Sequence, residues 1–253
     1  MINNPKITIV TPVYNSVEYI EETIQSVLNQ DYNNIEYIIV DGGSNDGTIE
    51  IIKKYSKKID FFISERDLGM YDALNKGFKI ATGKYLAWIN SDDLYFKKSI
   101  SKAIELMEKN SYQWINGISA TLKKKKIKVR YLYHYPDIIL KNKLMTPCVW
   151  GYIPQESTIF TQELYIKSGG LNQKLKYAGD FDLWYKFSKI SKLKSINIPI
   201  GIFRRRNYQL SQNQKLYLKE INKKHCVIPF GKILRFLYSI VINNINKYVK
   251  KER

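Results

Sequence analysis

The sequence has few cysteines and no long apolar run, and both shortages narrow the kinds of protein it can be. Cys148 and Cys226 are the only cysteines among 253 residues, which is too few for a disulfide framework. No run of about 18 apolar residues occurs, so we expect no ordinary transmembrane helix. Residues 1–6 lead directly into a predicted strand, without the apolar core of a secretory signal. These shortages predict a reduced, cytoplasmic environment.

Glycine-rich phosphate-binding motifs are also missing. The loop at 41–48, Asp-Gly-Gly-Ser-Asn-Asp-Gly-Thr, is neither a Walker loop nor G-x-G-x-x-G, so dinucleotide and P-loop chemistry have no support. Its glycines nevertheless let the backbone approach a ligand, and Asp41 at a strand end can accept hydrogen bonds from a base or ribose. The alternative is a tight turn in which Asp46 caps the next helix, and that role is compatible with ligand binding.

Acidic side chains are scarce in the second part of the chain. Residues 1–100 carry 11 Lys or Arg and 14 Asp or Glu, whereas residues 101–253 carry 30 and 9. This asymmetry predicts an anionic partner for the second part, such as nucleic acid, acidic lipid or a phosphorylated substrate. The open alternative is a solvated, lysine-rich face without a dedicated partner.

A hydrophobic content of 44% allows a real core, and the apolar periodicity predicts an α/β fold. In the first hundred residues, strands of the buried type alternate with helices, which requires a parallel sheet with right-handed crossovers. The expected strands are 7–11, 35–40, 61–63, 85–89, 113–118 and 193–198. The expected helices are 17–28 with Asn15 and Glu18 as a capping pair, 48–55, 70–81, 97–109 and 161–169.

Two adjacent carboxylates follow the apolar run at 85–89. In open α/β sheets, ligands bind outside the carboxyl ends of strands, so Asp92 and Asp93 are placed at such a site. Because the two carboxylates repel each other, a cation is the usual remedy, and an oxygen-only ligand set favours Mg²⁺ or Mn²⁺. The alternative is a solvated turn in which the acidic pair caps a helix at 94–107.

A third carboxylate of interest lies much later in the chain. Asp180 opens a predicted helix whose apolar positions include Leu183 and Trp184. The helix dipole favours the ionised carboxylate there, so Asp180 could act as a general base or simply as a cap. Further on, the arginines at 204–206 are placed in a polar loop, where they could clamp a diphosphate or lie on the surface.

The middle and the end of the chain carry aromatic and basic residues. The lysines at 123–126 fit an exposed hairpin tip, and the tyrosines at 131–135 could stack on sugars or bases or pack in a β-rich cover. The segment from Phe230 to Val249 has one broad apolar face and an opposite basic face. It is typical of a helix that lies on an anionic membrane, with docking on the domain's own core as the alternative.

Taken together, these stretches resemble the family 2 glycosyltransferases with a GT-A fold, and more closely the branch that builds bacterial surface polysaccharides of the colanic acid and O-antigen type. The specific matches lie in order across residues 6–95, a weaker one runs from Gln155 to Trp184, and the resemblance fades beyond about residue 200. The matching stretches are Ile9-Val10-Thr11-Pro12-Val13-Tyr14-Asn15, Gln25-Ser26-Val27-Leu28-Asn29-Gln30, Val40-Asp41-Gly42-Gly43-Ser44-Asn45-Asp46-Gly47-Thr48, the segment from Ser64 to Gly77 and Asn90-Ser91-Asp92-Asp93.

The resemblance implies an enzyme that takes a nucleotide-diphospho-sugar donor and Mn²⁺ or Mg²⁺. Asp93 would hold the metal, Asp92 the ribose or the metal, and Asp180 would deprotonate the acceptor hydroxyl. The acceptor would contact Gln155, Glu156 and Trp184. The donor would contact Thr11, Pro12, Tyr14, Asp41, Gly43, Asp67, Asp72, Lys76, Asn90, Ser91, Asp92 and Arg204, with Tyr14 and Asp41 at the nucleotide base.

Three departures from the family pattern qualify what the resemblance implies. The common Asp-Asp-Gly-Ser is Asp41-Gly42-Gly43-Ser44 here, so one expected base contact is missing or made by the backbone. Gly179 replaces the Glu of the usual Glu-Asp pair, which leaves Asp180 as its only carboxylate. The Gln-x-x-Arg-Trp signature of processive synthases is absent, and this favours addition of a single sugar. With Asp180 as the base, the resemblance implies attack from the face opposite to the leaving group, with inversion and without a covalent intermediate.

The expected organisation is a GT-A domain at 1–220 and a basic amphipathic extension at 221–253. Within the domain, 1–100 would be the nucleotide-sugar and metal half, and 101–220 the acceptor half. The resemblance places the protein in the cytoplasm, peripheral on the inner face of the cell membrane, with a lipid-linked glycan as acceptor.

Two rival functions have less support. A nucleotidyltransferase would carry basic residues in its glycine-rich entry loop, and residues 11–16 have none. A basic nucleic-acid-binding protein would fit the charge alone, but no recognition motif supports it, so we expect no nucleic-acid partner.

Overall fold

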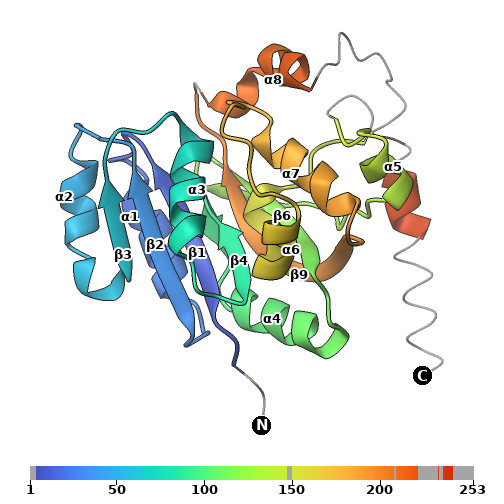
Figure 1. The fold of residues 1–253 in the computed structure, drawn as a ribbon, viewed down its shortest axis with the longest axis horizontal. Helices are drawn as coiled ribbons and strands as arrows, with labels where there is room; N and C mark the ends of the chain where they lie inside the picture. The colour runs from blue at the N-terminus through green and yellow to red at the C-terminus, as the bar shows by residue number, and fades with distance from the viewer. Residues whose placement is uncertain (1–3, 147–149, 208, 222–232, 234–235, 242–253) are drawn as a thin grey trace.

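A computed structural model describes residues 4–146, 150–207, 209–221, 233 and 236–241. Within them, one nine-stranded sheet runs through the molecule in the order β3-β2-β1-β4-β8-β6-β9-β5, with β7 paired to β6 (Figure 1). Helices cover the two faces of this sheet. The mixed α/β fold with a mostly parallel sheet is confirmed.

The first half is the predicted parallel unit. Strands β1, β2, β3 and β4 pair in parallel, and the helices between them form the crossovers. Strands β1, β2 and β4 are almost wholly buried because they are covered on both faces, which explains their continuous apolar runs. The bounds are β1 Ile7–Val13, α1 Ile20–Leu28, β2 Ile35–Asp41, α2 Thr48–Lys53, η1 Ser56–Lys58, β3 Phe61–Ser64, α3 Met70–Ile80 and β4 Tyr85–Trp88.

The second half adds mixed pairing to the same sheet. Strand β8 is antiparallel to both β4 and β6, and β9 is parallel to β6. The sheet is therefore continuous across the expected boundary at residue 100. The bounds are β5 Leu94–Tyr95, α4 Ser99–Asn110, β6 Trp114–Lys123, β7 Lys126–Val129, α5 Asp137–Lys141, η2 Gln155–Ser157, β8 Thr158–Thr161, α6 Gln162–Lys167, α7 Gly179–Ser188, β9 Lys194–Arg204, η3 Leu210–Gln212 and α8 Gln214–Glu220.

Three local expectations are wrong. Helix α4 begins at Ser99, and residues 94–95 form β5 against β9, so the acidic pair does not cap a helix. Helix α1 begins at Ile20, because Asn15 has a positive φ of 44° and its side chain accepts the Asn45 N–H instead of capping. The third expectation concerned Arg204, which ends β9 instead of lying in a loop, since the strand extends to pair with β6.

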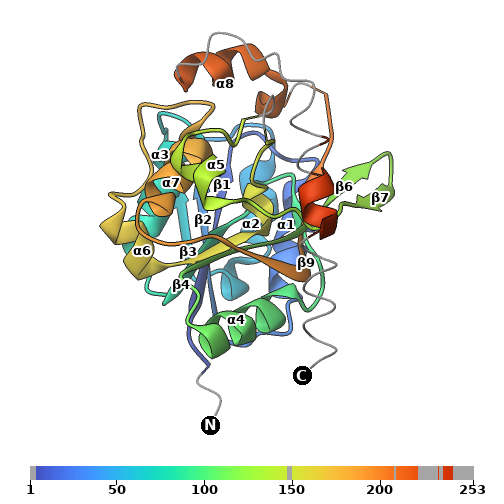
Figure 2. The same cartoon turned by 90° about the vertical axis from the view of Figure 1, so that its right-hand side faces the viewer.

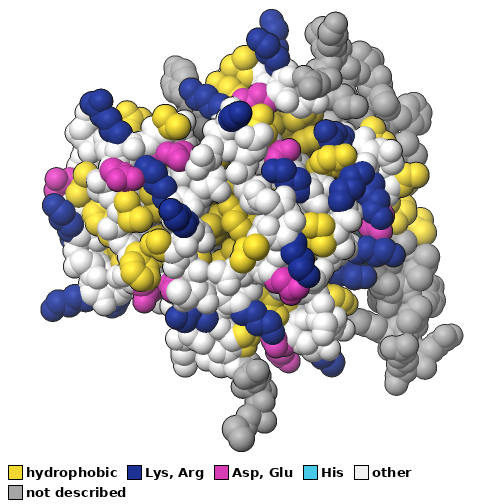
Figure 3. Space-filling view, viewed as in Figure 1, with side chains coloured by type: hydrophobic (Ala, Val, Ile, Leu, Met, Phe, Trp, Pro, Cys, Tyr) yellow, Lys and Arg dark blue, Asp and Glu magenta, His cyan; other side chains and the backbone are white. Residues whose placement is uncertain are grey.

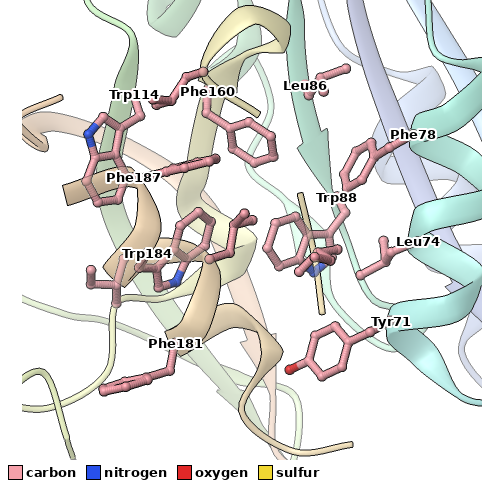
Figure 4. Close-up of a cluster of buried hydrophobic side chains, with 14 of the residues drawn as sticks. Tyr71, Leu74, Phe78, Leu86, Trp88, Trp114, Phe160, Phe181, Trp184 and Phe187 are labelled. Atoms are coloured by element: carbon pink, nitrogen blue, oxygen red, sulfur yellow. The ribbon is translucent and has the colours of Figure 1, made fainter. Parts of the chain in front are cut away.

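An aromatic core joins the two halves (Figure 4). The indole of Trp184 from α7 stacks on Trp88 of β4 at 5.4 Å and on Trp114 of β6 at 5.8 Å between ring centroids. Pairs of this kind contribute about 0.5–1.5 kcal/mol each beyond the area they bury. With 1% of its surface exposed, Trp184 is a core residue, and the expectation that it binds an acceptor is wrong.

The C-terminal extension lies mostly outside the described residues. The described piece 236–241 is helical and packs on the domain, where the Phe236 ring meets Tyr131 at 5.4 Å and Tyr238 meets Trp150 at 5.6 Å. The Ser239 hydroxyl accepts the His134 N–H at 3.2 Å. Among the described helices, none has both the length and the apolar content that a bilayer crossing needs.

Candidate active site

The carboxyl ends of β1, β2, β3 and β4 lie at one edge of the sheet. Val13 is in register with Asp41, and Asp41 is in register with Ser64, so three strands end level with one another. The chain after β4 leads from the same edge into the acidic pair. The strand-end prediction is therefore confirmed, because the sheet brings residues 13–16, 41–48, 64–69 and 90–93 together.

Asp41 organises the loop that follows β2. Its carboxylate is fully buried and accepts the N–H groups of Gly43 and Ser44 at 3.1 Å, and the Ser64 hydroxyl at 2.8 Å. The Ser44 hydroxyl donates to it as well. A direct contact with a nucleotide base would require the loop to release one of these bonds. At the end of the loop, Asp46 accepts the N–H and hydroxyl of Thr48, which confirms its capping role.

The chain after β1 presents one large exposed side chain at this edge. Tyr14 is 65% exposed, and its backbone neighbour Asn15 is tied to the 41–48 loop through the Ser44 hydroxyl at 2.8 Å. Thr11 is buried and exchanges a 3.1 Å hydrogen bond with the Tyr37 hydroxyl, while Pro12 is buried within the β1–β2 pair. Of the β1 residues implied by the resemblance, Tyr14 alone is therefore open to a ligand.

The turn between β3 and α3 packs against the same loop. An ideal Cβ at Gly42 would lie 2.5 Å from a carboxylate oxygen of Asp67, so the absence of a side chain at residue 42 makes room for Asp67. Asp67 accepts the Gly69 N–H at 2.8 Å, and Asp72 accepts the Leu68 N–H at 3.1 Å. These carboxylates shape the turn beside the 41–48 loop.

Lys76 is placed differently from the other expected donor contacts. It forms ion pairs with Glu65 at 2.7 Å and with Asp72 at 3.6 Å. It also lines a shallow surface hollow between α3 and the segment before α7, together with Lys79, Lys174 and Lys186. The structure thus gives Lys76 a role in holding the β3–α3 turn.

Asp93 is as fully buried as Asp41. It is 0% exposed, and its carboxylate accepts the Arg204 backbone N–H at 2.8 Å, the Gln155 side-chain amide at 3.4 Å and the Asn90 amide at 3.5 Å. Burial raises the pKa of Asp93 well above its ordinary value, and the charges of Asp92 and Glu156 raise it further. The site therefore has an excess of negative potential.

The oxygen atoms around Asp93 fit a hard divalent cation. The side-chain oxygens Asn90 Oδ1 and Gln155 Oε1 are buried and have no hydrogen-bond partner in the described part of the chain. Their amide nitrogens both point to Asp93, so two unsatisfied oxygens lie beside a carboxylate pair. The described residues hold no group of three His, Cys, Asp or Glu side chains suited to a metal. A cation at this place would therefore take one or two carboxylates from the protein and complete its ligands with substrate phosphates, as Mg²⁺ does.

Asp92 faces the arginines that follow β9. Its carboxylate pairs with Arg206 Nε at 2.6 Å and accepts the Gln209 amide at 3.2 Å. Arg204 donates to the Asp92 carbonyl at 2.8 Å and pairs with Glu22 at 2.7 Å. Arg204 is therefore committed to the protein, whereas Arg206, another of the three arginines considered as a diphosphate clamp, holds the Asp92 carboxylate.

Asp180 is the second residue of α7 and lies beside Tyr71 at the start of α3. Its Oδ1 accepts the Phe181 N–H at 2.8 Å and lies 3.4 Å from the Tyr71 hydroxyl. Burial raises the pKa of Asp180 to about 6, although its hydrogen bonds act in the other direction. The expectation that the helix dipole would favour the ionised form is thus outweighed by burial. A carboxyl with this pKa can take a proton near neutral pH.

Glu156 is enclosed in the protein and interacts electrostatically with both Asp93 and Asp180. It is 3% exposed and accepts the Ser119 hydroxyl at 2.5 Å. Its charge raises the pKa of both Asp93 and Asp180, while burial raises its own. The expectation that Glu156 contacts an acceptor is wrong, because its side chain is enclosed. Gln155 beside it faces Asp93 instead of an acceptor surface.

Sequence reasoning missed Tyr71 and Gln209, and it missed the contact between Arg206 and Asp92. Tyr71 lies inside a matched stretch, but only the fold shows that it reaches Asp180. Arg206 and Gln209 contact Asp92 across more than a hundred residues, so no local pattern could pair them.

Comparison with known proteins agrees with this geometry. The sequence profile of glycosyl transferase family 2 matches residues 8–165, well over half of the chain. The chain belongs to glycosyltransferase family 2. An uncharacterized glycosyltransferase of Rickettsia typhi is 31% identical over 268 residues, with 98% of this chain and 82% of that protein covered. A Bacillus subtilis protein named as a teichuronic acid biosynthesis glycosyltransferase, TuaG, is 39% identical over 110 residues, covering 42% of this chain and 44% of that protein.

Solved structures share the GT-A fold with this glycosyltransferase. Residues 1–349 of S. aureus TarS in complex with UDP-GlcNAc align with a TM-score of 0.68 and 19% identity, over 82% of this chain and 61% of that one. The mannosyltransferase PcManGT from Pyrobaculum calidifontis, in complex with GDP-Man and Mn²⁺, aligns with a TM-score of 0.64 and 18% identity, over 91% of this chain and 68% of that one.

Proposed function

We propose that this glycosyltransferase moves one sugar from a nucleotide-diphospho-sugar to a hydroxyl of a glycan acceptor, with inversion and with Mn²⁺ or Mg²⁺. The observation that carries the proposal is the pairing of two unlike acidic centres at one edge of the sheet. Next to Asp92, Asp93 has the unpaired amide oxygens of Asn90 and Gln155 beside it, and burial raises the pKa of Asp180 to about 6. The carboxylates of Asp92 and Asp93 suit a cation that would bind the diphosphate leaving group, and Asp180 suits proton removal from the acceptor.

The donor would bind along the strand ends. Tyr14, with its exposed ring, would stack on the base, and the backbone of the 41–48 loop, held by Asp41, would lie against the nucleoside. Arg206, which is partly exposed, would move from the Asp92 carboxylate toward the diphosphate. TarS with UDP-GlcNAc and PcManGT with GDP-Man have the same fold and support this donor class.

Asp93, Asn90 and Gln155 would hold the cation, with Asp92 beside them. The cation would offset the negative charge that develops on the leaving diphosphate. The protein's own part is to keep these oxygens fixed, which Arg204 does by donating its backbone N–H to Asp93. The pKa of Asp93 is raised, which means that the ionised carboxylate is unfavourable at this buried position unless a cation offsets its charge.

Asp180 would take the proton of the acceptor hydroxyl as it attacks. Tyr71 and the Phe181 N–H bind the carboxylate and fix its direction. Attack from the face opposite to the leaving diphosphate inverts the anomeric carbon in one step. A base in this role contributes about 10²- to 10⁴-fold to the rate.

The acceptor is proposed to be lipid-linked, in the synthesis of a surface polysaccharide. The likeness to TuaG over part of the chain supports this substrate class. An exposed apolar patch supports membrane contact: the hairpin of β6 and β7 and the piece 236–241 lie side by side (Figure 2). The patch consists of Ile127, Val129, Tyr131, Leu237 and Val241, all more than half exposed, beside the exposed lysines 123–126. Anionic lipid contributes about 1 kcal/mol for each basic residue near its surface.

Hydrolysis of a panel of nucleotide-sugars, with and without Mn²⁺, tests the proposed reaction. We expect release of nucleoside diphosphate from at least one donor and loss of that release in EDTA. Tight binding of a labelled oligonucleotide, without donor hydrolysis, would contradict the proposal and favour the nucleic-acid alternative.

A further inference from the structure

Helix α8 ends on the segment that leads into α7. The Glu220 carboxylate at the end of α8 accepts three consecutive backbone N–H groups: Lys176 at 2.8 Å, Tyr177 at 2.8 Å and Ala178 at 2.9 Å. Successive N–H groups that point to one centre form an anion-binding nest, and the amino end of a helix adds its dipole. Glu220 fills this nest from a helix that is more than forty residues away in the chain.

The nest is directly connected to Asp180. Ala178 is the N-terminal cap of α7, and its carbonyl accepts the Asp182 N–H at 3.0 Å. The Tyr71 hydroxyl lies 3.4 Å from the Tyr177 carbonyl, 3.3 Å from the Asp180 N–H and 3.4 Å from its carboxylate. A shift of residues 176–178 would therefore move the group that orients the Asp180 carboxylate.

Close packing leaves this connection little freedom. An ideal Cβ at Gly179 would lie 2.7 Å from the Tyr71 ring, so the backbone at the start of α7 rests against that ring. On the other side, Tyr217 of α8 meets Phe181 of α7 at 6.3 Å and Tyr152 at 5.1 Å between ring centroids. Figure 1 shows α8 at the end of the molecule where α7 begins.

We propose that Glu220 is a positioning residue that acts through the backbone of residues 176–178 to hold Asp180 in place for proton removal. The inference rests on the proposed role of Asp180 as the base. It makes α8, which follows the arginines of the donor site, part of the catalytic assembly. Glu220 itself is not expected to touch donor or acceptor.

The charges around Asp180 fix the direction of the expected pH effect. The titratable groups that interact with Asp180 are Tyr71 of α3, Glu156 of η2 and Tyr217 of α8, while Glu220 of α8 acts on Tyr71 and Tyr217. Burial raises the pKa of Asp180, and the charge of Glu156 adds to this effect. Loosening the nest in Glu220→Gln admits water to Asp180, and because burial is what raises the pKa of this carboxyl, its pKa should fall.

The test is the substitution Glu220→Gln, with Lys219→Gln as the matched control on the same helix. The amide keeps the shape of the side chain but turns an NH₂ toward the N–H groups of the nest. We expect amide hydrogen exchange at residues 176–182 to become at least tenfold faster. Hydrolysis of UDP-GlcNAc or GDP-mannose, whichever the wild type prefers, should show kcat about tenfold lower with KM for the donor within twofold. The acid limb of kcat should move to lower pH by about one unit, and Lys219→Gln should change none of these.

The outcomes separate this inference from the proposed function. Unchanged exchange and an unchanged pH profile in Glu220→Gln, while Asp180→Asn is inactive, would overturn the role of Glu220 alone. Full turnover in Asp180→Asn would overturn the base assignment and the inference with it. If Glu220→Gln does not fold, Glu220→Asp is measured in the same way. Aspartate keeps the charge, but its side chain is one methylene shorter and should not reach all three N–H groups of residues 176–178. Wild-type exchange and kinetics in Glu220→Asp would also overturn the proposal.

Discussion

At the scale of single residues, the active site contains carboxylates whose environments differ. Asp93 is enclosed and accepts three N–H groups, Asp92 pairs with Arg206, and Asp180 is partly buried beside the phenol of Tyr71. The same chemical group can therefore bind a cation in one place and accept a proton in another. Three predictions follow from these environments.

Asp93→Asn should keep the fold and lose metal-dependent turnover. The amide keeps the hydrogen bond from Arg204 but removes the charge that attracts the cation. We expect a loss of at least about 100-fold in kcat, by analogy with the removal of one charge-stabilising group from an active site. Mn²⁺ titration of donor hydrolysis measures it, with the exposed Asp31→Asn as control. Normal Mn²⁺-dependent turnover in Asp93→Asn would contradict the assignment.

Asp180→Asn should bind donor normally and turn over about 10²- to 10⁴-fold more slowly. Since the pKa of Asp180 is raised to about 6, the wild-type rate should rise as pH increases through 6 and then level off. The measurement is kcat from pH 5 to 8. A wild-type rate that stays flat down to pH 5 would show that another group takes the proton.

The same substitution should also change stability with pH. The pKa of Asp180 in the folded state is above its ordinary value of 3.8, so the folded state favours the protonated carboxyl. The resulting contribution to the free energy of unfolding is fully present below pH about 4 and is lost as pH rises through 6. Asp180→Asn should therefore be more stable than wild type at pH 7.5, by roughly 2–3 kcal/mol, and equal to it at pH 4. Urea unfolding at both pH values measures the difference. Equal stability at pH 7.5 would contradict the raised pKa.

At the scale of elements, the loops after β2 and β3 are fitted to each other. Gly42 has no side chain, and this leaves room for the Asp67 carboxylate. The effects of substitutions at residues 42 and 67 on stability should therefore depend on each other. Gly42→Ala should cost about 1–3 kcal/mol of unfolding free energy and weaken donor binding, because the new Cβ displaces a carboxylate that is bonded to Gly69. Gly42→Ala combined with Asp67→Gly should recover part of that loss. A double-mutant cycle measures the coupling, and strict additivity would contradict it.

The elements also show what the sequence could and could not predict. Strands β1, β2 and β4 were predictable because burial on both faces gives an uninterrupted apolar run. Strands β5 and β8 were not, because they span two and four residues and pair only across distant segments. The site follows the same division. Asp93 and Asp180 were found from their positions at element ends, whereas Arg206 and Glu220 act through contacts with distant segments.

At the scale of the whole molecule, basic side chains are spread unevenly over the surface. Figure 3 shows Lys and Arg gathered over α5 and α7, where Lys143 and Lys189 lie over the Tyr185 ring and Lys192 pairs with Asp137. The apolar patch with its neighbouring lysines lies over β6, β7 and residues 236–241. The second half of the chain thus presents both positive charge and apolar surface, and the proposed membrane contact rests on these two features.

Leu237→Glu combined with Val241→Glu should reduce sedimentation with anionic liposomes while leaving donor hydrolysis in solution unchanged. Both side chains are more than half exposed, so the fold should tolerate the change. The exposed Ile190→Glu on another surface is the control. Added salt should weaken wild-type binding, because lysine contributes part of the attraction. Unchanged sedimentation of the double variant would contradict the membrane proposal.

The stacked indoles of Trp88, Trp114 and Trp184 have a consequence for spectroscopy. Rings 5.4 and 5.8 Å apart, with planes inclined by 16° and 24°, couple their electronic transitions. The three rings come from β4 in the first half of the chain and from β6 and α7 in the second half, so they keep this arrangement only while the two halves remain assembled. The near-ultraviolet circular dichroism of the native protein should therefore carry an optical signal that reports on the joining of the two halves.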